Sequence, residues 1–179
     1  MGKLHYLKLL GFWAGFLILH YAYDFFPILP LKLVSGINES FFQHIKIVFF
    51  TYLIVNLVEF LTRRKVLENR ESYILTRLFS TTILPWFVFI IWFMAPAYYG
   101  PIGNVAVEIL YANIALLLSG FCTLVIEQTM DGIPYHNLSK VVIIALFVIS
   151  MSLYIIFTFK LPWADVFADP TAMIEVITI

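Results

Sequence analysis

The chain has 179 residues, of which 62% are hydrophobic and only 12% are charged, and its mean hydropathy is +0.94. Soluble domains are about 45–50% apolar and about 25% charged, so this composition excludes a soluble globular protein and predicts contact with a lipid bilayer. Eleven basic residues balance eleven acidic ones, and the lack of a basic excess argues against a nucleic-acid partner. The single cysteine, Cys122, excludes an intrachain disulfide.

Five apolar stretches are long enough to cross a bilayer, which takes about 20 helical residues. In chain order, the predicted helices cover residues 7–26, 39–61, 74–94, 105–126 and 141–159. Pro27 ends the first, and Pro85 predicts a kink within the third. Because lipid offers no hydrogen-bond partners, all five are expected to be helical. The predicted fold is therefore all-α, a bundle of five transmembrane helices that forms a single domain over residues 1–179.

Basic residues gather between the second and third predicted helices, namely Arg63, Arg64, Lys65, Arg70 and Arg77. The positive-inside rule makes this connection cytoplasmic. The N-terminus is then predicted inside and the C-terminus outside, in a multi-pass protein of the cell membrane.

Polar residues gather at the predicted outer ends of the first two helices. His20 and Asp24 are four residues apart and share one helix face. The second helix begins with Asn38, Glu39, Ser40, Gln43, His44 and Lys46. One interpretation is a helix start, in which Asn38 is the N-cap and Glu39 complements the helix dipole, or in which the helix starts later and Ser40 with Gln43 forms a capping box. This interpretation needs no cofactor, but it does not explain His44 or Lys46 within an apolar helix.

A second interpretation is a metal or acid/base site built from His20, Asp24, Glu39 and His44. Imidazole and carboxylate ligands suit zinc or another first-row divalent ion. In a catalytic version a metal-bound water is the nucleophile, Glu39 or Asp24 is the general base, and Lys46 stabilises an anion. This version predicts a metal-assisted hydrolase embedded in the membrane.

A third interpretation is a small ion or proton carrier. Its relay groups would be Asn56 and Glu59 in the second helix, with Glu108 and Asn113 in the fourth. Pairing of Glu59 with the basic residues that follow it is the structural alternative.

The favoured hypothesis is a non-enzymatic accessory or interaction protein with a polar pocket at the outer membrane surface. This pocket would dock lipid headgroups, a membrane protein partner or a second copy of the chain. The connection between the first two helices is only about eleven residues long, which predicts adjacent antiparallel helices. We therefore expect all five candidate residues (His20, Asp24, Glu39, His44 and Lys46) to converge, with the segment 160–170 folded over them.

The segment N-E-S-F-F-Q-H-I-K at residues 38–46 resembles a family of small prokaryotic multi-pass membrane proteins of unknown function, whose signature is N-E-S-x-x-E-H-x-K. The upstream pair His20 and Asp24 supports the resemblance, and the tail motifs F-T-F-K-L-P and F-A-D-P are similar to the family's F-T-x-x-P-P and L-F-x-D-P. The chain departs from this pattern at Gln43, where the family has Glu, and at Leu161, where it has Pro. The resemblance implies the same span layout along the whole chain and no particular activity.

Overall fold

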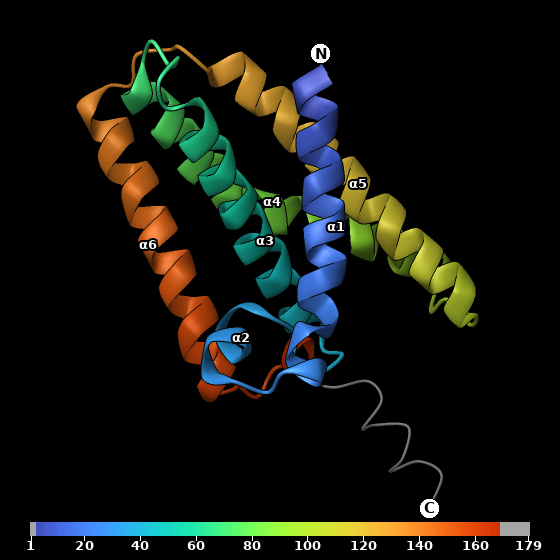
Figure 1. Cartoon of the computed structure of the whole chain (residues 1–179). Coiled ribbons are helices and arrows are strands. Elements are labelled where there is room, and N and C mark those ends of the chain that lie inside the picture. The colour runs from blue at the N-terminus through green and yellow to red at the C-terminus, as the bar shows by residue number, and fades with distance from the viewer. Residues whose placement is uncertain (1–2, 169–179) are drawn as a thin grey trace, which may run out of the picture.

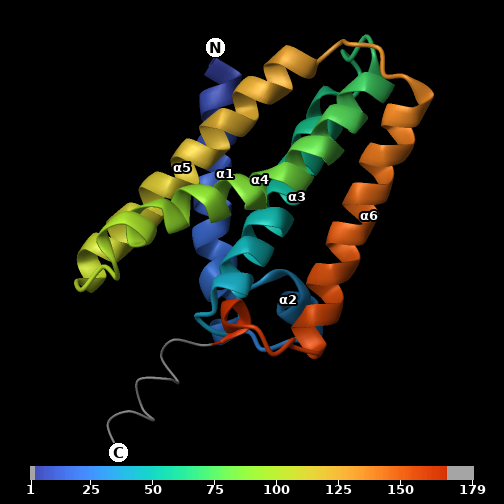
Figure 2. The same cartoon turned by 180° about the vertical axis from the view of Figure 1, so that it is seen from behind.

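The computed structural model describes residues 3–168, and within them the chain is all-α, as the sequence predicts (Figure 1). The helices are α1 (Lys3–Phe25), α2 (Leu29–Val34), α3 (Phe41–Arg63), α4 (Arg70–Tyr99), α5 (Val105–Met130) and α6 (Asn137–Phe159), followed by one 3-10 turn, η1 (Asp165–Phe167). In both views α3 runs between α1 and α6, and α5 packs against α4 and α1 (Figures 1 and 2).

Four of these helices, α3 to α6, are long and apolar enough to cross a membrane. The protein is therefore a candidate multi-pass membrane protein that contacts the lipid bilayer. The helix α1, which contains the first predicted span, does not meet this criterion, although it has 23 residues. Its sequence includes Lys8, His20 and Asp24, which lower the apolar character of the segment.

The helix boundaries differ from the predicted ones where capping side chains set them. The hydroxyl of Ser40, rather than the side chain of Asn38, accepts from the backbone N–H of Gln43, so α3 begins at Phe41. The side chain of Asn69 accepts from the backbone N–H of Ser72, which starts α4 earlier than predicted. A short helix, α2, occupies the connection that follows α1.

The helix α4 contains two internal prolines, and a side chain from α5 inserts near the second one. The hydroxyl of Tyr111 donates to the carbonyl oxygen of Ile91 and accepts from the backbone N–H of Ala95. Pro96 disturbs the preceding turn of α4. The hydroxyl therefore satisfies the carbonyl of Ile91 and the N–H of Ala95, which would pair with each other in a regular helix.

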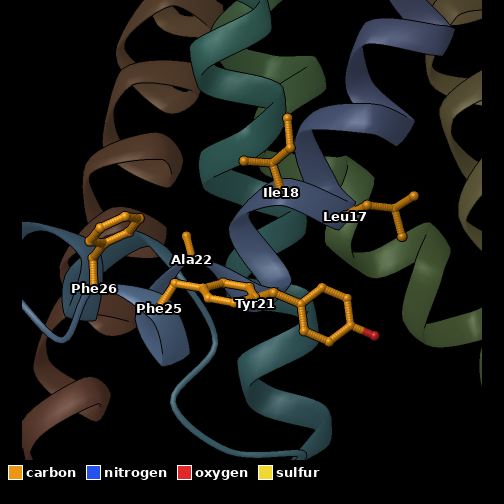
Figure 3. Close-up of a pocket in the computed structure, with 6 residues that line it drawn as sticks. All are labelled: Leu17, Ile18, Tyr21, Ala22, Phe25 and Phe26. Atoms are coloured by element: carbon orange, nitrogen blue, oxygen red, sulfur yellow. The ribbon is translucent and has the colours of Figure 1, made fainter.

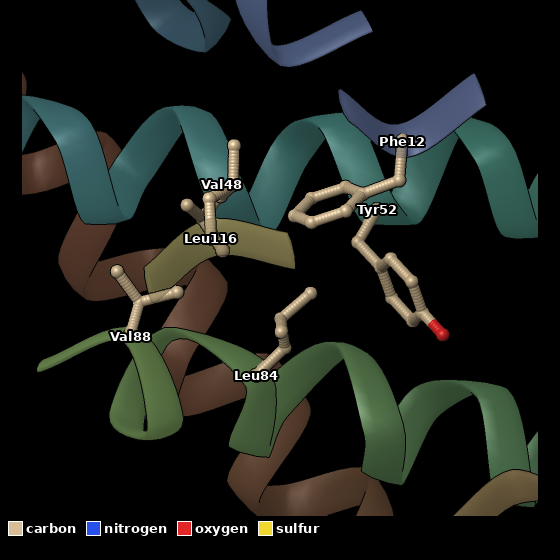
Figure 4. Close-up of a cluster of buried hydrophobic side chains, with 6 residues drawn as sticks. All are labelled: Phe12, Val48, Tyr52, Leu84, Val88 and Leu116. Atoms are coloured by element: carbon tan, nitrogen blue, oxygen red, sulfur yellow. The ribbon is translucent and has the colours of Figure 1, made fainter. Parts of the chain in front are cut away.

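An apolar cluster fills the centre of the molecule (Figure 4). It joins α1, α3, α4 and α5, and its members are Phe12, Val48, Tyr52, Leu84, Val88 and Leu116. A Cβ atom at Gly15 would lie 2.9 Å from Thr51, and one at Gly120 would lie 2.7 Å from Leu9. These glycines therefore allow α1 to approach α3 and α5 closely.

This cluster separates two polar regions of the molecule. We call the region around α2, the end of α1 and the start of α3 the α2 end, and the region around the α3–α4 and α5–α6 connections the loop end. In Figure 1 the α2 end is at the bottom and the loop end is at the top.

Candidate functional site

Three of the predicted site residues converge at the α2 end. The Nε2 atom of His20, at the end of α1, lies 3.8 Å from Oε1 of Glu39. The Nε2 atom of His44, in α3, lies 3.6 Å from Oε2 of the same carboxylate. The two imidazole rings are 5.1 Å apart between centroids. The candidate ligand atoms of these residues all lie within 4.8 Å of one another. We call His20, Glu39 and His44 the His–Glu–His group.

These separations suit a bound ion better than direct hydrogen bonds. Hydrogen bonds between nitrogen and oxygen are about 2.7–3.2 Å long, so Glu39 is too far from both imidazoles to bond them well. Ligands held about 2.0–2.1 Å from a tetrahedral zinc ion are about 3.3 Å from each other. A contraction of a few tenths of an ångström would bring Glu39 and each imidazole to that spacing.

The tautomer of His44 is set by the backbone of its own helix start. Its Nδ1 atom lies 2.9 Å from the carbonyl oxygen of Ser40, and a carbonyl can only accept a hydrogen bond. Nδ1 therefore carries a proton, so the neutral imidazole presents the lone pair of Nε2 toward Glu39. Backbone anchoring of one ring nitrogen is the usual support for a metal-binding histidine. The Nδ1 atom of His20 is buried without a partner, so this imidazole is not held by a competing hydrogen bond.

The group is open on one side. The side chain of Glu39 is 52% exposed, whereas that of His20 is 15% exposed. An ion held here would therefore be reachable from outside the bundle. Three protein ligands would leave one tetrahedral position for water or another ligand.

Asp24, the fourth predicted ligand, does not join the group. Its side chain is exposed, and the structure gives it no ion pair with any described residue. Although Asp24 shares a face of α1 with His20, the carboxylate that faces both imidazoles comes from Glu39, just before α3.

Lys46 lies apart from the His–Glu–His group. Two residues along a helix turn the side chain through about 200°, so Lys46 and His44 point to different sides of α3. Its Nζ atom donates to the carbonyl oxygen of Lys32 at 3.0 Å and to the hydroxyl of Thr158 at 3.3 Å. Lys46 therefore links α3 to α2 and α6, and the structure does not show the predicted approach to His20.

The segment after α6 packs against the start of α3. The ring of Phe167 lies 4.8 Å from that of Phe42 and 5.4 Å from that of Phe157, between centroids. The predicted fold-back of this segment is thus seen as far as residue 168, and residues 169 and 170 lie outside the described residues. Its contacts are to the side of α3 that carries Phe42, not to the His–Glu–His group.

A larger polar network, which the sequence interpretation missed, lies at the loop end. Glu127 is 1% exposed, and four groups surround its carboxylate. Its Oε2 atom is 2.6 Å from Nζ of Lys8 and 3.4 Å from Nε of Arg77. Its Oε1 atom accepts from the hydroxyls of Tyr52 at 2.9 Å and Ser80 at 2.6 Å. Glu127 therefore connects α1, α3, α4 and α5.

Glu59 and Asp131 complete this network. Glu59 lies 2.7 Å from Lys8, 2.9 Å from Arg63 and 3.4 Å from Arg77. The guanidinium of Arg77 also donates two hydrogen bonds to the carboxylate of Asp131, at 2.8 and 3.0 Å. Three cationic and three anionic side chains thus balance one another, so we describe this loop-end network as a structural tie between helices.

Among the groups predicted as a proton relay, Glu59 belongs to the loop-end network. Glu59 is engaged by three cations, as the charge-pairing alternative proposed. Asn56 donates to Thr81, and Asn113 accepts from the indole of Trp13. Glu108 is exposed in the first turn of α5. The apolar cluster lies between the two ends, which argues against a continuous polar path.

A shallow apolar groove lies on α1 near the α2 end (Figure 3). Its lining residues are Leu17, Ile18, Tyr21, Ala22, Phe25 and Phe26. One of them, Tyr21, follows His20 directly, and its ring lies 4.6 Å from the His20 imidazole between centroids. The groove therefore borders the His–Glu–His group at Tyr21, and apolar exposure of this kind is normal for a helix in lipid.

No protein-family model, curated protein or solved structure matches this chain.

Proposed function

We propose that the protein is a metal-binding multi-pass membrane protein that holds a divalent transition ion, such as zinc, in the His–Glu–His group. The observation that carries this proposal is the convergence of His20, Glu39 and His44, with the His44 tautomer set by the carbonyl of Ser40. Two imidazoles and one carboxylate are a ligand set that zinc accepts.

We further propose that α1 is a fifth span. It runs beside α3 along most of its length (Figures 1 and 2), and its 23 residues rise about 34 Å as a helix. Lys8, the charge deepest within it, is paired with two carboxylates, which removes most of the penalty for a buried ammonium. The basic α3–α4 connection supports a cytoplasmic loop end, and the α2 end would then face outward in the cell membrane of a prokaryote.

Metal binding in an accessory or interaction protein is better supported than hydrolysis. The predicted anion stabiliser, Lys46, is engaged by α2 and α6 instead of facing the group. Glu39 would be a metal ligand and not a general base, and Asp24 is outside the His–Glu–His group. A metal at the exposed α2 end would order the junction between α1 and α3 and present an open coordination position to a partner side chain or a lipid headgroup.

Hydrolysis remains the second candidate because three protein ligands leave a position for an activated water. A zinc-loaded preparation that cleaves ester or amide substrates, and loses this activity with His44→Ala, would favour it.

Metal analysis of the purified, tag-free protein tests the proposal. We expect about one zinc ion per chain after equilibration with zinc, and at least a tenfold weaker affinity in His20→Ala and His44→Ala. His136→Ala is the matched control, because His136 is exposed at the start of α6 and its side chain makes no capping hydrogen bond. Equal zinc affinity in all variants would refute the site.

A further inference from the structure

Lys46 is a fully buried lysine without an anionic partner among the described residues. It has no exposed surface, and its ammonium donates only to a backbone carbonyl and a hydroxyl. Among the side chains that the structure describes, no carboxylate oxygen lies within 4.0 Å of its Nζ atom. The charged group that acts on it is another lysine, Lys32. A buried ammonium without a partner of opposite sign is strongly unfavourable, so Lys46 keeps its charge here only if an anion binds beside it.

Further unpaired polar groups lie in the same part of the fold. Gln43 precedes Lys46 by three residues, so their side chains are neighbours on α3. Gln43 has no exposed surface, and both polar atoms of its amide lack a partner among the residues that the structure describes. Ser35, just after α2, has a buried hydroxyl that also lacks a partner. Since buried polar groups are nearly always paired, these orphaned atoms point to a missing ligand or water.

We propose that Lys46 and Gln43 bind a chloride-sized inorganic anion between α2, α3 and α6. The ammonium of Lys46 has a third N–H to offer, and the amide of Gln43 supplies a second donor. Lys32 adds a positive potential from the neighbouring helix, where its ammonium lies 5.5 Å from the ring centre of Phe159. Because Lys46 and Gln43 are both fully buried, a monatomic anion suits this site better than a phosphate group.

This site is separate from the His–Glu–His group, which lies on another side of α3. A bound anion would neutralise Lys46 and hold α2 and α6 against α3, so its main measurable effect is on stability. Ligands that bind only the folded state raise its stability in proportion to the logarithm of their concentration.

Thermal unfolding in nanodiscs of zwitterionic lipid tests the proposal, with sodium chloride replacing sodium gluconate at constant ionic strength. We expect Tm of the wild type to rise by about 3 °C and to keep rising with the logarithm of the chloride concentration. Lys46→Met should abolish the response. Lys160→Met, which removes an exposed lysine just after α6, and His44→Ala should both retain it.

Gln43→Glu keeps the test informative if Lys46→Met does not fold. A carboxylate at this position would supply the missing negative charge from within α3. We expect this variant to have a higher Tm than the wild type in gluconate and to lose the response to chloride. Equal Tm values of the wild type in chloride and gluconate would overturn the proposal and leave water as the occupant. A response to phosphate but not to chloride would overturn the assignment of a chloride-sized ion.

Discussion

The ammonium of Lys8 lies 2.6 Å from the carboxylate of Glu127, a residue 119 positions further along the chain. This contact fastens the start of α1 to the end of α5, while Glu59 and Arg77 bring α3 and α4 to the same point. These buried charges therefore hold four helices together at one end of the bundle.

Glu127→Gln should destabilise the protein by about 3–5 kcal/mol, because it leaves Lys8 and Arg77 facing a neutral amide in a buried setting. Unfolding monitored by tryptophan fluorescence in detergent measures this loss. Lys140→Met is the matched control. It removes an ion pair with Glu71, whose side chain is 65% exposed, and should cost at most about 1 kcal/mol. Similar losses in the two variants would contradict the structural role of Glu127.

Two glycines one helical turn apart on α1 should respond differently to alanine. Gly15→Ala places a Cβ atom 2.9 Å from Cγ2 of Thr51, and such overpacking costs about 1–3 kcal/mol. Gly11→Ala meets nothing within 4 Å, so it should be neutral or stabilise by up to about 1 kcal/mol through helix propensity. The comparison uses the same unfolding measurement, and the reverse order would mean that α1 does not pack on α3 as described.

Reporter fusions test the orientation. A reporter that is active only in the cytoplasm should be active when it is fused after Asn69, in the α3–α4 connection. The same reporter should be inactive when it is fused after Ile179, which we expect to lie outside. A cytoplasmic signal from both fusions would mean that an even number of spans lies between Asn69 and Ile179, which contradicts three spans formed by α4, α5 and α6.

Proton flux into liposomes tests the carrier interpretation. The apolar cluster between the two polar ends should block a continuous path, so we expect flux equal to that of protein-free liposomes. Glu108→Gln, at an exposed position, should change neither this flux nor the stability. A flux that is present in the wild type and lost in Glu59→Gln would restore the carrier interpretation.

Much of the fold follows from the sequence because the chain must satisfy its backbone in an apolar setting. Hydropathy alone predicts long helices, since only helices pair every backbone group within the segment. Ser40 marks where α3 begins, although Asn38 was an alternative cap, whereas the cap at Asn69 was not predicted and α4 begins before residue 74. The convergence of His20 and His44 was also predictable, because a short connection keeps successive helices adjacent.

Only the tertiary structure decided which polar residues share a site. Asp24 and Lys46 match the predicted cluster in sequence, yet Asp24 is not part of the His–Glu–His group and Lys46 binds to α2 and α6 instead. Glu127 comes directly after the predicted fourth span, where the sequence indicates the start of the loop to the fifth span. Its role depends on Lys8 and Arg77 reaching the same depth from other helices. Hydropathy records how apolar a segment is, whereas the rotation and relative depth of packed helices, which bring charges together, arise from contacts distant in sequence.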